Sequence, residues 1–319
     1  YIMNDLIREI ENADSIAITG HINPDGDCIG STLGMYNYIT SNYPDKRVQV
    51  YLQEFSDVFM FLNGASEVKH ETDDETYDLF MSLDCGDPDR FTPFAQYYET
   101  ANRTLCIDHH ISNKGFGDVC YVEPQACSAA EAIFKLLDED KINQPCAEAL
   151  YMGIVHDTGV FKHSNTTRSA MTIAGILIEK GARPSFVIDE TFYKKTLTQN
   201  KLLGYALLGM KQFANGKIAH TLLTFDDFEK FGASKMDTDG IVDQLRLTSG
   251  TEVAFFMYQA GEDNYKISLR ANDIVNVSEI ACSHGGGGHV KAAGCTLDMP
   301  MDEALALIKS ELEDYWNDI

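Results

Sequence analysis

Acidic and imidazole side chains directly follow a short β-prone run at residues 104–107. The run ends in Asp108, His109 and His110. A run of this kind predicts a buried strand, and polar residues after the carboxyl end of a strand face the crevice where open α/β sheets bind ligands. By itself the triplet is compatible with metal or acid–base chemistry, and equally with a polar strand end or a solvated histidine pair. The chemistry therefore depends on which other residues gather at this edge.

A second set of such side chains lies in the segment HINPDGD at 21–27, between a predicted strand and a predicted helix. Its proline and glycine favour a tight, preformed turn. His21, Asp25 and Asp27 are therefore candidates for cation binding. A helix cap and a turn carboxylate would also account for the two acids.

Two further acids occupy comparable positions. Asp84 ends the apolar run 77–83, and Asp157 follows a predicted helix at 147–155 and lies close to a glycine. We expect both carboxylates at the same edge of the sheet as the DHH triplet. In contrast, we expect the neighbouring His156 to be a packed or capping residue.

So many carboxylates cannot share a crevice unless cations neutralise them, because like charges in a partly desolvated site raise one another's pKa. Aspartate oxygen and histidine nitrogen without thiolate suit Mn²⁺, Mg²⁺, Fe²⁺ or Co²⁺, and ligand type alone does not choose among these ions. With six ligands available, we expect two ions about 3.5–4 Å apart that share one carboxylate. Such a pair clamps the attacking and leaving oxygens of a displacement at phosphorus and lowers the pKa of a bridging water. The candidate residues are His21, Asp25, Asp27, Asp84, Asp108, His109, His110 and Asp157.

The net charge limits the partners of the protein. The chain of 319 residues carries 49 acidic and 25 basic side chains, which gives a formal charge of −24. Proteins that grip long duplexes carry a basic stripe, so we expect no long duplex nucleic acid as a partner and only short substrates held in a local pocket. A simpler interpretation is that the acidity keeps a cytoplasmic protein soluble.

The eight cysteines are scattered without a CxxC pair. This predicts free thiols in a reducing compartment and argues against thiolate-bound zinc. The sequence contains no run of about 18 apolar residues, the length that would predict a membrane helix. The first residues predict an amphipathic helix around Leu6, Ile7 and Ile10 rather than a signal sequence. We therefore expect a cytoplasmic protein that does not bind membranes.

Several apolar runs in the first part of the chain predict buried strands that end in polar residues, which is typical of open, mainly parallel α/β sheets flanked by helices. We therefore predict an α/β domain at 1–185 that positions the candidate residues. Its strands are predicted at 15–20, 47–52, 77–83 and 104–107, and its helices at 28–35, 129–137, 147–155 and 167–180.

The rest of the chain predicts a helical linker at 186–213 and a smaller α+β domain at 214–319. We expect a cleft between the two domains. The strands of the smaller domain are predicted at 218–225, 252–258 and 265–270, and its helices at 238–247 and 302–318.

Four consecutive glycines lie at 285–288, between His284 and His289, and one further strand of the smaller domain is predicted after them. Such a run carries a large entropic cost, and we interpret it as too rich in glycine to serve packing. It is expected where the backbone approaches a ligand closely, so we predict a phosphate or base contact here. A flexible surface loop is the alternative.

Taken in order, these motifs closely resemble the DHH phosphoesterase family. The resemblance rests on HxxPDxD at 21–27, Asp84, DHH at 108–110 and Asp157. The GGGGH segment, with AAG shortly after it at 292–294, resembles the companion DHHA1 domain, so the resemblance covers nearly the whole chain. In its length and in the segment GIVHDTG, the chain is most similar to the branch of bifunctional oligoribonucleases and pAp phosphatases.

The resemblance implies a role for each residue of the first domain. His21, Asp25 and Asp84 would hold one ion, and Asp84 would bridge it to the other. The second ion would be held by Asp27, Asp84, His109 and Asp157. Asp108 would orient the site from behind the ligands. His110 would face the scissile phosphate as an electrophile or as proton donor to the leaving group.

In the smaller domain, the resemblance implies that Arg270 pairs with phosphate. The substrate's terminal nucleotide would be held by Gly285, Gly286, Gly287, Gly288 and His289. Further candidates, which solvated surface cations would also explain, are Arg90, Arg246 and Lys291. The chain departs from the family pattern at His284, where an aromatic residue is frequent, and at Ala271, where serine is usual. These departures concern base stacking and phosphate hydrogen bonds, not the metal ligands.

The implied function is a Mn²⁺-dependent hydrolase, with Mg²⁺ or Co²⁺ as alternative ions. It would remove mononucleotides from short single-stranded RNA oligomers and dephosphorylate 3′-phosphoadenosine 5′-phosphate (pAp), and a homodimer is compatible with it. The first alternative is a phosphodiesterase for cyclic dinucleotides or their linear products. A nucleotide-binding module without catalysis would predict a broken ligand set, and an inorganic pyrophosphatase would not need the glycine–histidine loop.

Overall fold

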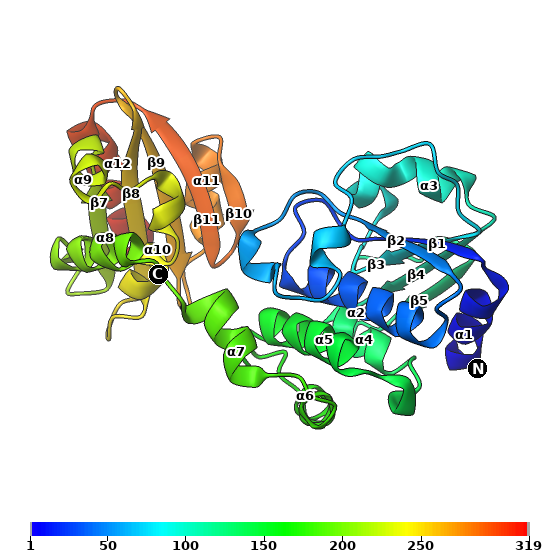
Figure 1. Cartoon of the computed structure of the whole chain (residues 1–319). Helices are drawn as coiled ribbons and strands as arrows, with labels where there is room; N and C mark the ends of the chain where they lie inside the picture. Colours follow the sequence, from blue (N-terminus) through cyan, green and yellow to red (C-terminus); the bar gives the residue numbers. More distant parts are fainter. Residues whose placement is uncertain (1, 318–319) are drawn as a thin grey trace. The chain divides into compact units, whose positions relative to one another are not determined.

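The structure, a computed structural model, describes residues 2–317 (Figure 1). They fold into two compact units that divide after Lys194. This division falls inside the predicted linker at 186–213. Helix α8 (Leu197–Leu208) lies in the same range and contributes buried side chains to a core of the second unit. The helix therefore belongs to the second unit, and a separate linker remains a prediction.

The first unit is built on a five-stranded parallel sheet with the order β2-β1-β3-β4-β5. Its strands are β1 (Ser15–Thr19), β2 (Arg47–Tyr51), β3 (Leu79–Leu83), β4 (Arg103–Asp108) and β5 (Val119–Val122). The predicted parallel sheet with flanking helices is confirmed. Strand β5 was not predicted, because this short edge strand is half-exposed and lacks a continuous apolar run.

Helices cover this sheet on both faces (Figure 1). The α-helices of the first unit are α1 (Ile2–Asn12), α2 (Gly26–Asn42), α3 (Ala95–Thr100), α4 (Ala129–Phe134), α5 (Gln144–Asp157), α6 (Arg168–Glu179) and α7 (Pro184–Ile188). Helices α2 and α5 are in close contact, because a Cβ atom on Gly30 would lie only 2.5 Å from the carbonyl oxygen of Ala149. A glycine is therefore required where the two helices meet.

Alternate residues of β1 point to opposite faces of the sheet. Ile16 and Ile18 belong to the core that the sheet shares with α2 and α5. Ala17 instead lies in an aromatic cluster with Phe80 and Tyr97. Burial on both faces is typical of parallel sheets. It leaves the strand ends as the place where polar side chains gather.

The second unit contains a six-stranded mixed sheet with the order β10-β11-β9-β8-β7-β6. The strands are β6 (Lys211–Phe213), β7 (Ile218–Leu223), β8 (Val253–Gly261), β9 (Asn264–Ala271), β10 (Gly287–His289) and β11 (Ala292–Asp298). The remaining helices are α9 (Phe225–Phe231), α10 (Ile241–Arg246), α11 (Val277–Ser283) and α12 (Met301–Asn317). The predicted α+β character of this domain is confirmed.

The strand predicted at 218–225 ends at Leu223 in the structure, and helix α9 begins at Phe225. Strand β7 ends at Leu223, because the side chain of Asp227 accepts hydrogen bonds from the backbone N–H of Thr224 (2.8 Å) and from its hydroxyl (2.9 Å) and starts the helix. Across residues 2–317, the helices are all too short or too polar to cross a membrane.

We expect the second unit to lose stability in acid because of His220 on β7. Its ring is buried and stacks on Phe255 at 4.9 Å, and burial lowers its pKa to about 4. Because the folded protein favours the neutral ring, His220 is fully compatible with folding above about pH 6.5 and opposes it as the pH falls towards about 4. His220→Phe should remove this penalty, which reaches about 3 kcal/mol in acid.

Urea unfolding at several pH values would test this prediction. The wild type should lose more free energy of unfolding between neutral and acidic pH than His220→Phe does. His70→Phe is the matched control, because His70 is exposed and lies in the first unit. Equal losses in the wild type and His220→Phe would contradict the prediction.

Candidate active site

Three parallel strands deliver predicted ligands to one edge of the first sheet. His21 and Asp84 lie just beyond β1 and β3, and His109 directly follows β4. The carboxyl ends of parallel strands meet at a common edge, as the sequence analysis assumed. Asp27 enters this edge from the first turn of α2, and Asp157 enters it from the last residue of α5.

One group of side chains surrounds His21. Its Nε2 lies 3.5 Å from Asp84 Oδ2 and 3.7 Å from Asp25 Oδ1. Asp25 also caps α2, since its Oδ1 accepts hydrogen bonds from the N–H groups of Asp27 and Cys28 at 3.1 Å. Asp25 therefore caps helix α2 and also lies close to the candidate ligand His21.

A second group surrounds His109. Its Nε2 lies 3.3 Å from Asp157 Oδ2, 3.5 Å from Asp84 Oδ1 and 3.8 Å from Asp27 Oδ2. Asp84 thus presents one carboxylate oxygen to each group. This is the position that a bridging ligand between two ions requires.

The separations within both groups are longer than direct hydrogen bonds. Direct N–H···O hydrogen bonds measure about 2.7–3.2 Å. Two donor atoms bound to one ion at about 2.1 Å lie about 3.0–3.4 Å apart in octahedral or tetrahedral geometry. The shortest distance around His109, 3.3 Å, falls within this range, and the shortest around His21, 3.5 Å, lies just above it. The side chains are therefore spaced more like a ligand shell than like directly bonded partners.

Asp84 is held in an unfavourable state that a cation would relieve. The residue is buried, and its Oδ1 atom has no hydrogen-bond partner among the described residues. Its backbone is left-handed, with φ of 55°, a conformation that costs about 1–3 kcal/mol in a residue other than glycine. A buried carboxylate oxygen without a partner adds a further cost. The residues present therefore fit a divalent cation at this position.

Asp27 is fixed in place by backbone groups. Its Oδ2 accepts from Ala129 N–H at 2.6 Å, and its Oδ1 accepts from Ala130 N–H at 3.1 Å and from the Ser31 hydroxyl at 3.2 Å. Burial and the neighbouring Asp84 raise the pKa of Asp27 well above its usual range. A bound cation would reverse this effect and keep the carboxylate charged.

The titration of the other groups reports the same excess of negative charge. Burial lowers the pKa of both His21 and His109, but the surrounding carboxylates outweigh burial and raise each pKa to about 10. Burial and the Asp84 carboxylate raise the pKa of Asp157 to about 7. A field that favours protonated imidazole also attracts metal ions.

Asp108 supports His110 instead of facing the two ligand groups. Its Oδ1 lies 2.8 Å from His110 Nδ1, and its Oδ2 accepts a hydrogen bond from Asn113 Nδ2 at 2.8 Å. Burial raises the pKa of Asp108, but these two partners outweigh burial and lower it. The contact uses Nδ1, so Nε2 of the half-exposed His110 ring remains available to a ligand. Asn113 was not predicted as a site residue from the sequence, because its contact with Asp108 depends on the conformation of the loop after His110.

A small pocket of about 180 Å³ adjoins these residues. It is lined by His21, Asp84, Gly86, Asp87, Arg90, His110 and Ser112. The guanidinium of Arg90 has no hydrogen-bond or ion-pair partner among residues 2–317, so it is available to an anion. Asp87 caps the following 3-10 helix (Pro88–Phe94), because its side chain accepts a hydrogen bond from Asp89 N–H at 2.9 Å.

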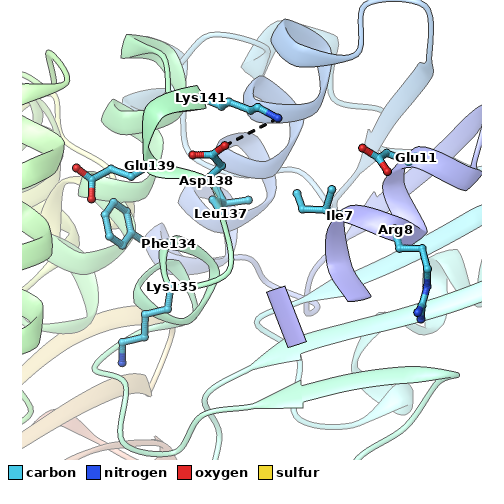
Figure 2. Close-up of a pocket in the computed structure, with 9 residues that line it drawn as sticks. All are labelled: Ile7, Arg8, Glu11, Phe134, Lys135, Leu137, Asp138, Glu139 and Lys141. Atoms are coloured by element: carbon cyan, nitrogen blue, oxygen red, sulfur yellow. Dashed lines mark ion pairs between the residues drawn. The ribbon is translucent and has the colours of Figure 1, made fainter. Parts of the chain in front are cut away.

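A larger pocket in the first unit contains none of the predicted site residues. It measures about 610 Å³ and lies between α1 and residues 134–141 (Figure 2). Its charged side chains include an ion pair between Lys141 and Asp138 at 3.9 Å. Volume alone therefore does not identify the reactive site.

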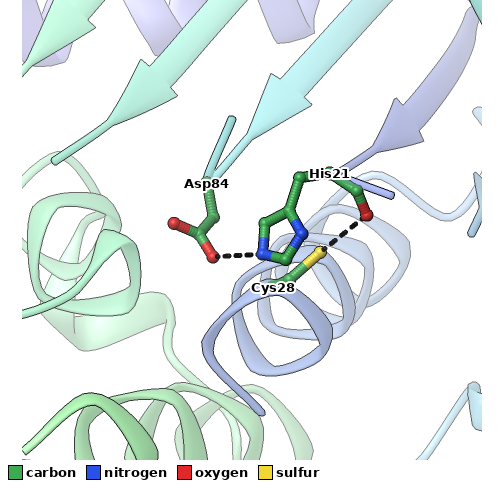
Figure 3. Close-up of side chains that lie close together, drawn as sticks. All are labelled: His21, Cys28 and Asp84. Carbon is green, nitrogen blue, oxygen red and sulfur yellow. Dashed lines mark hydrogen bonds and ion pairs between the residues drawn. The ribbon is translucent and has the colours of Figure 1, made fainter. Parts of the chain in front are cut away.

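Cys28 lies beside His21 and Asp84 (Figure 3). Its thiol donates to the carbonyl oxygen of His21 at 3.9 Å, and it is buried. Burial and the Asp84 carboxylate raise its pKa well above the usual range. We therefore interpret Cys28 as a neutral packing residue.

His156 is a packed residue, as predicted. Its ring lies 5.3 Å from that of Phe59 and 4.5 Å from that of Phe192. Burial lowers its pKa to about 4, so the ring is neutral near neutral pH.

Two of the glycines at 285–288 have a packing role, so the expectation that packing could not explain the run is wrong. A Cβ atom on Gly286 would lie 2.2 Å from the carbonyl oxygen of Gly294, and one on Gly288 would lie 2.4 Å from that of Ala292. Strand β10 can pair with β11 only because these residues lack side chains. Gly285 and Gly287 have no neighbour within 4 Å of such an atom, and both line a pocket of about 490 Å³.

Arg270 lies on β9 and lines another pocket of the second unit, of about 350 Å³. Its Nε is 3.4 Å from Asp243 Oδ1. The next residue, Ala271, is buried in the core, which accounts for an apolar side chain at that position. His289, in contrast, is exposed.

Arg246, Lys291 and His284 of the second unit have structural partners. Arg246 donates to Asn272 Oδ1 at 2.7 Å, and Lys291 donates to the carbonyl oxygen of Asn272 at 2.8 Å. His284 Nε2 lies 2.9 Å from both carboxylate oxygens of Glu311. These contacts account for all three residues without a substrate.

Known proteins share this architecture. Residues 15–154 match the DHH family, N-terminal domain, and residues 215–317 match the DHHA1 domain. The bifunctional oligoribonuclease and PAP phosphatase NrnA of Bacillus subtilis is 30% identical, with 92% of each chain covered. The probable bifunctional oligoribonuclease and PAP phosphatase NrnA of Streptococcus mutans is also 30% identical, with 91% of each chain covered.

A solved structure agrees with these relatives. The crystal structure of an exopolyphosphatase-related protein from Bacteroides fragilis matches with a TM-score of 0.84 and 26% identity, over 98% of this chain and 96% of that one. The resemblance predicted from the sequence motifs is confirmed. This chain is a member of the DHH family of metal-dependent phosphoesterases and carries a C-terminal DHHA1 domain.

Proposed function

We propose that this phosphoesterase hydrolyses short oligoribonucleotides to mononucleotides and dephosphorylates pAp, and that it does so with two divalent cations. The observation that carries the proposal is the placement of Asp84, whose two oxygens face separate groups of ligands at 3.5 Å. The names of the two NrnA relatives support the choice of substrates.

Each ion would have its own ligands and share Asp84. His21 and Asp25 would complete the first site, and the second would be completed by Asp27, His109 and Asp157. A set of oxygen and imidazole ligands suits Mn²⁺, with Mg²⁺ and Co²⁺ as alternatives. When bound, such ions polarise the phosphate and lower the pKa of a coordinated water.

Residues of the chain would position the phosphate and move the proton. Arg90 would pair with a phosphate oxygen, because its guanidinium has no protein partner among the described residues. His110, held at Nδ1 by Asp108, would present Nε2–H to the leaving oxygen. His110 would thereby supply the proton that the leaving oxygen gains.

The second unit would supply contacts to the nucleotide. Arg270 would pair with a phosphate, and His289 with the glycines at 285–288 would contact the terminal nucleotide. The formal charge of −24 would disfavour long polyanions and leave short ones as substrates. All eight cysteines are free, which supports a reducing compartment such as the cytoplasm.

A substrate panel tests the proposal. Diribonucleotide, pAp, a cyclic dinucleotide and pyrophosphate would be compared with purified protein in Mn²⁺, Mg²⁺ or Co²⁺ after chelation. Turnover of the first two substrates is expected, and it should be lost with chelator and restored by Mn²⁺. Hydrolysis of the cyclic dinucleotide alone, or of pyrophosphate alone, would overturn the assignment.

Arg270→Ala should raise KM for pAp about 10- to 100-fold with little change in kcat, because a charge-assisted hydrogen bond contributes about 1.5–3 kcal/mol. Steady-state kinetics would measure both constants. Lys291→Ala is the matched control, since the ammonium group of Lys291 already donates to the Asn272 carbonyl. An unchanged KM for Arg270→Ala would remove Arg270 from the phosphate site.

A further inference from the structure

Two cysteines lie side by side on strands β4 and β5, and one of them, Cys106, precedes the DHH triplet by two residues. Strands β4 and β5 are parallel neighbours, and their register pairs Cys106 directly with Cys120. Paired residues of neighbouring strands project from the same face of the sheet. Cys106 is buried, whereas Cys120 is exposed. One thiol is therefore accessible to a reagent, and its neighbour is protected.

The surroundings of the two sulfurs differ. The neighbouring Cys106 thiol and the N–H of Phe116 lower the pKa of Cys120 to about 6, although burial opposes the shift. The neighbouring Cys120 thiol and burial raise the pKa of Cys106. An exposed thiolate beside a buried thiol is the arrangement of an attacking and a resolving cysteine.

The backbone geometry permits a disulfide between the two residues. Neighbouring strands lie about 4.7–4.9 Å apart, and disulfides span Cα separations of about 4.4–6.8 Å. Within residues 2–317, strand β5 is the edge of the sheet and pairs only with β4. It can therefore adjust to bring the two Cβ atoms closer without breaking a second strand pairing.

Cys106 is also connected to the proposed proton donor. Its sulfur lies 3.6 Å from Asn113 Nδ2, and the same amide donates to Asp108 Oδ2 at 2.8 Å. Asp108 in turn holds His110. A Cys106 sulfur turned towards Cys120 would no longer accept from Asn113, and the support of Asp108 and His110 would weaken.

We propose that Cys106 and Cys120 are a redox-active dithiol that a hydroperoxide converts to a disulfide, and that this disulfide slows phosphoester hydrolysis. The Cys120 thiolate attacks the peroxide, the O–O bond breaks, and a sulfenic acid forms with release of water or an alcohol. The Cys106 thiol then displaces water from the Cys120 sulfur and forms the S–S bond. Two electrons pass from the thiols to the peroxide.

The slower hydrolysis that we expect from the disulfide rests on the proposed function. The formation of the disulfide itself does not depend on that function. The full-length protein would be treated with hydrogen peroxide and analysed by intact mass and by peptide mapping without reduction. We expect the loss of two hydrogen atoms and a cross-linked peptide pair that contains Cys106 and Cys120. Dithiothreitol should reverse both changes.

Activity would be measured on the same samples. In the wild type, kcat for pAp should fall several-fold on oxidation and recover with dithiothreitol. Cys120→Ser should form no cross-link and keep its rate after peroxide. Cys282→Ser is the matched control and should behave as the wild type does, because Cys282 is an exposed thiol of the second unit.

Two outcomes would overturn the proposal. Absence of the Cys106–Cys120 peptide pair from peroxide-treated wild type would refute the dithiol, and this measurement needs no variant to fold. A fully cross-linked protein with unchanged kcat would refute the coupling to Asp108. If the untreated protein lacked pAp hydrolysis altogether, the proposed function would fail while the mass measurement still decided the dithiol.

Discussion

Asp84→Asn should make the metal-free protein more stable and abolish its hydrolysis of pAp. The carboxylate of Asp84 is buried among other acids, and one of its oxygens has no hydrogen-bond partner among residues 2–317. Asparagine has the same shape, lacks the charge and tolerates the left-handed backbone at this position. We expect the free energy of unfolding to rise by about 1–3 kcal/mol without metal.

The same substitution should remove the response to metal. Wild-type protein should gain thermal stability in Mn²⁺, because a ligand that binds only the folded state stabilises it. Asp84→Asn should show little gain, and kcat should fall by at least about 1,000-fold, since metal ions supply several kcal/mol of transition-state stabilisation. Thermal unfolding and kcat, each with and without Mn²⁺, would measure both effects.

Asp78→Asn provides the matched control. Asp78 Oδ2 accepts from Asp14 N–H at 3.1 Å, from Ser15 N–H at 2.9 Å and from the Ser15 hydroxyl at 2.8 Å, away from the candidate ligands. This variant should lose about 1–3 kcal/mol of stability and keep its gain in Mn²⁺. If Asp84→Asn instead lost stability in the same way and still bound Mn²⁺, Asp84 would be a structural residue and not the bridge.

The parts that sequence analysis predicted depend on short-range patterns. His21, Asp84 and His109 each follow an apolar run directly, and parallel strands bring such ends to one edge of a sheet. The parallel sheet was predicted from these apolar runs and the polar residues at their ends. The convergence of these residues therefore follows from local periodicity and one general rule of α/β folds.

The parts that were missed depend on tertiary contacts. The interaction of Asn113 with Asp108 is set by the shape of one loop. The pairing of Cys106 with Cys120 requires the register of β5, an edge strand without a clear apolar pattern. The packing role of Gly286 becomes visible only once β11 lies against it. Motif and composition carry no information on such contacts.

His110→Ala should lower kcat for a diribonucleotide by about 100- to 10,000-fold, the usual contribution of a positioned general acid. The contact between Asp108 and Nδ1 leaves Nε2 of this half-exposed ring available to a leaving oxygen. An alkoxide needs that proton, whereas a nitrophenolate leaves without it. The loss should therefore be much smaller with a p-nitrophenyl ester of a nucleotide. Steady-state kinetics on both substrates would measure the two ratios.

The comparison of leaving groups separates proton donation from other roles of the ring. Asn113→Ala should show the same dependence on the leaving group with a smaller loss, because it acts through Asp108. His70→Ala is the control, since the ring of His70 contacts the carbonyl oxygen of Leu52 and none of the candidate ligands. Equal losses on both substrates in His110→Ala would assign His110 to phosphate binding, because a residue that only binds the phosphate cannot distinguish the two leaving groups.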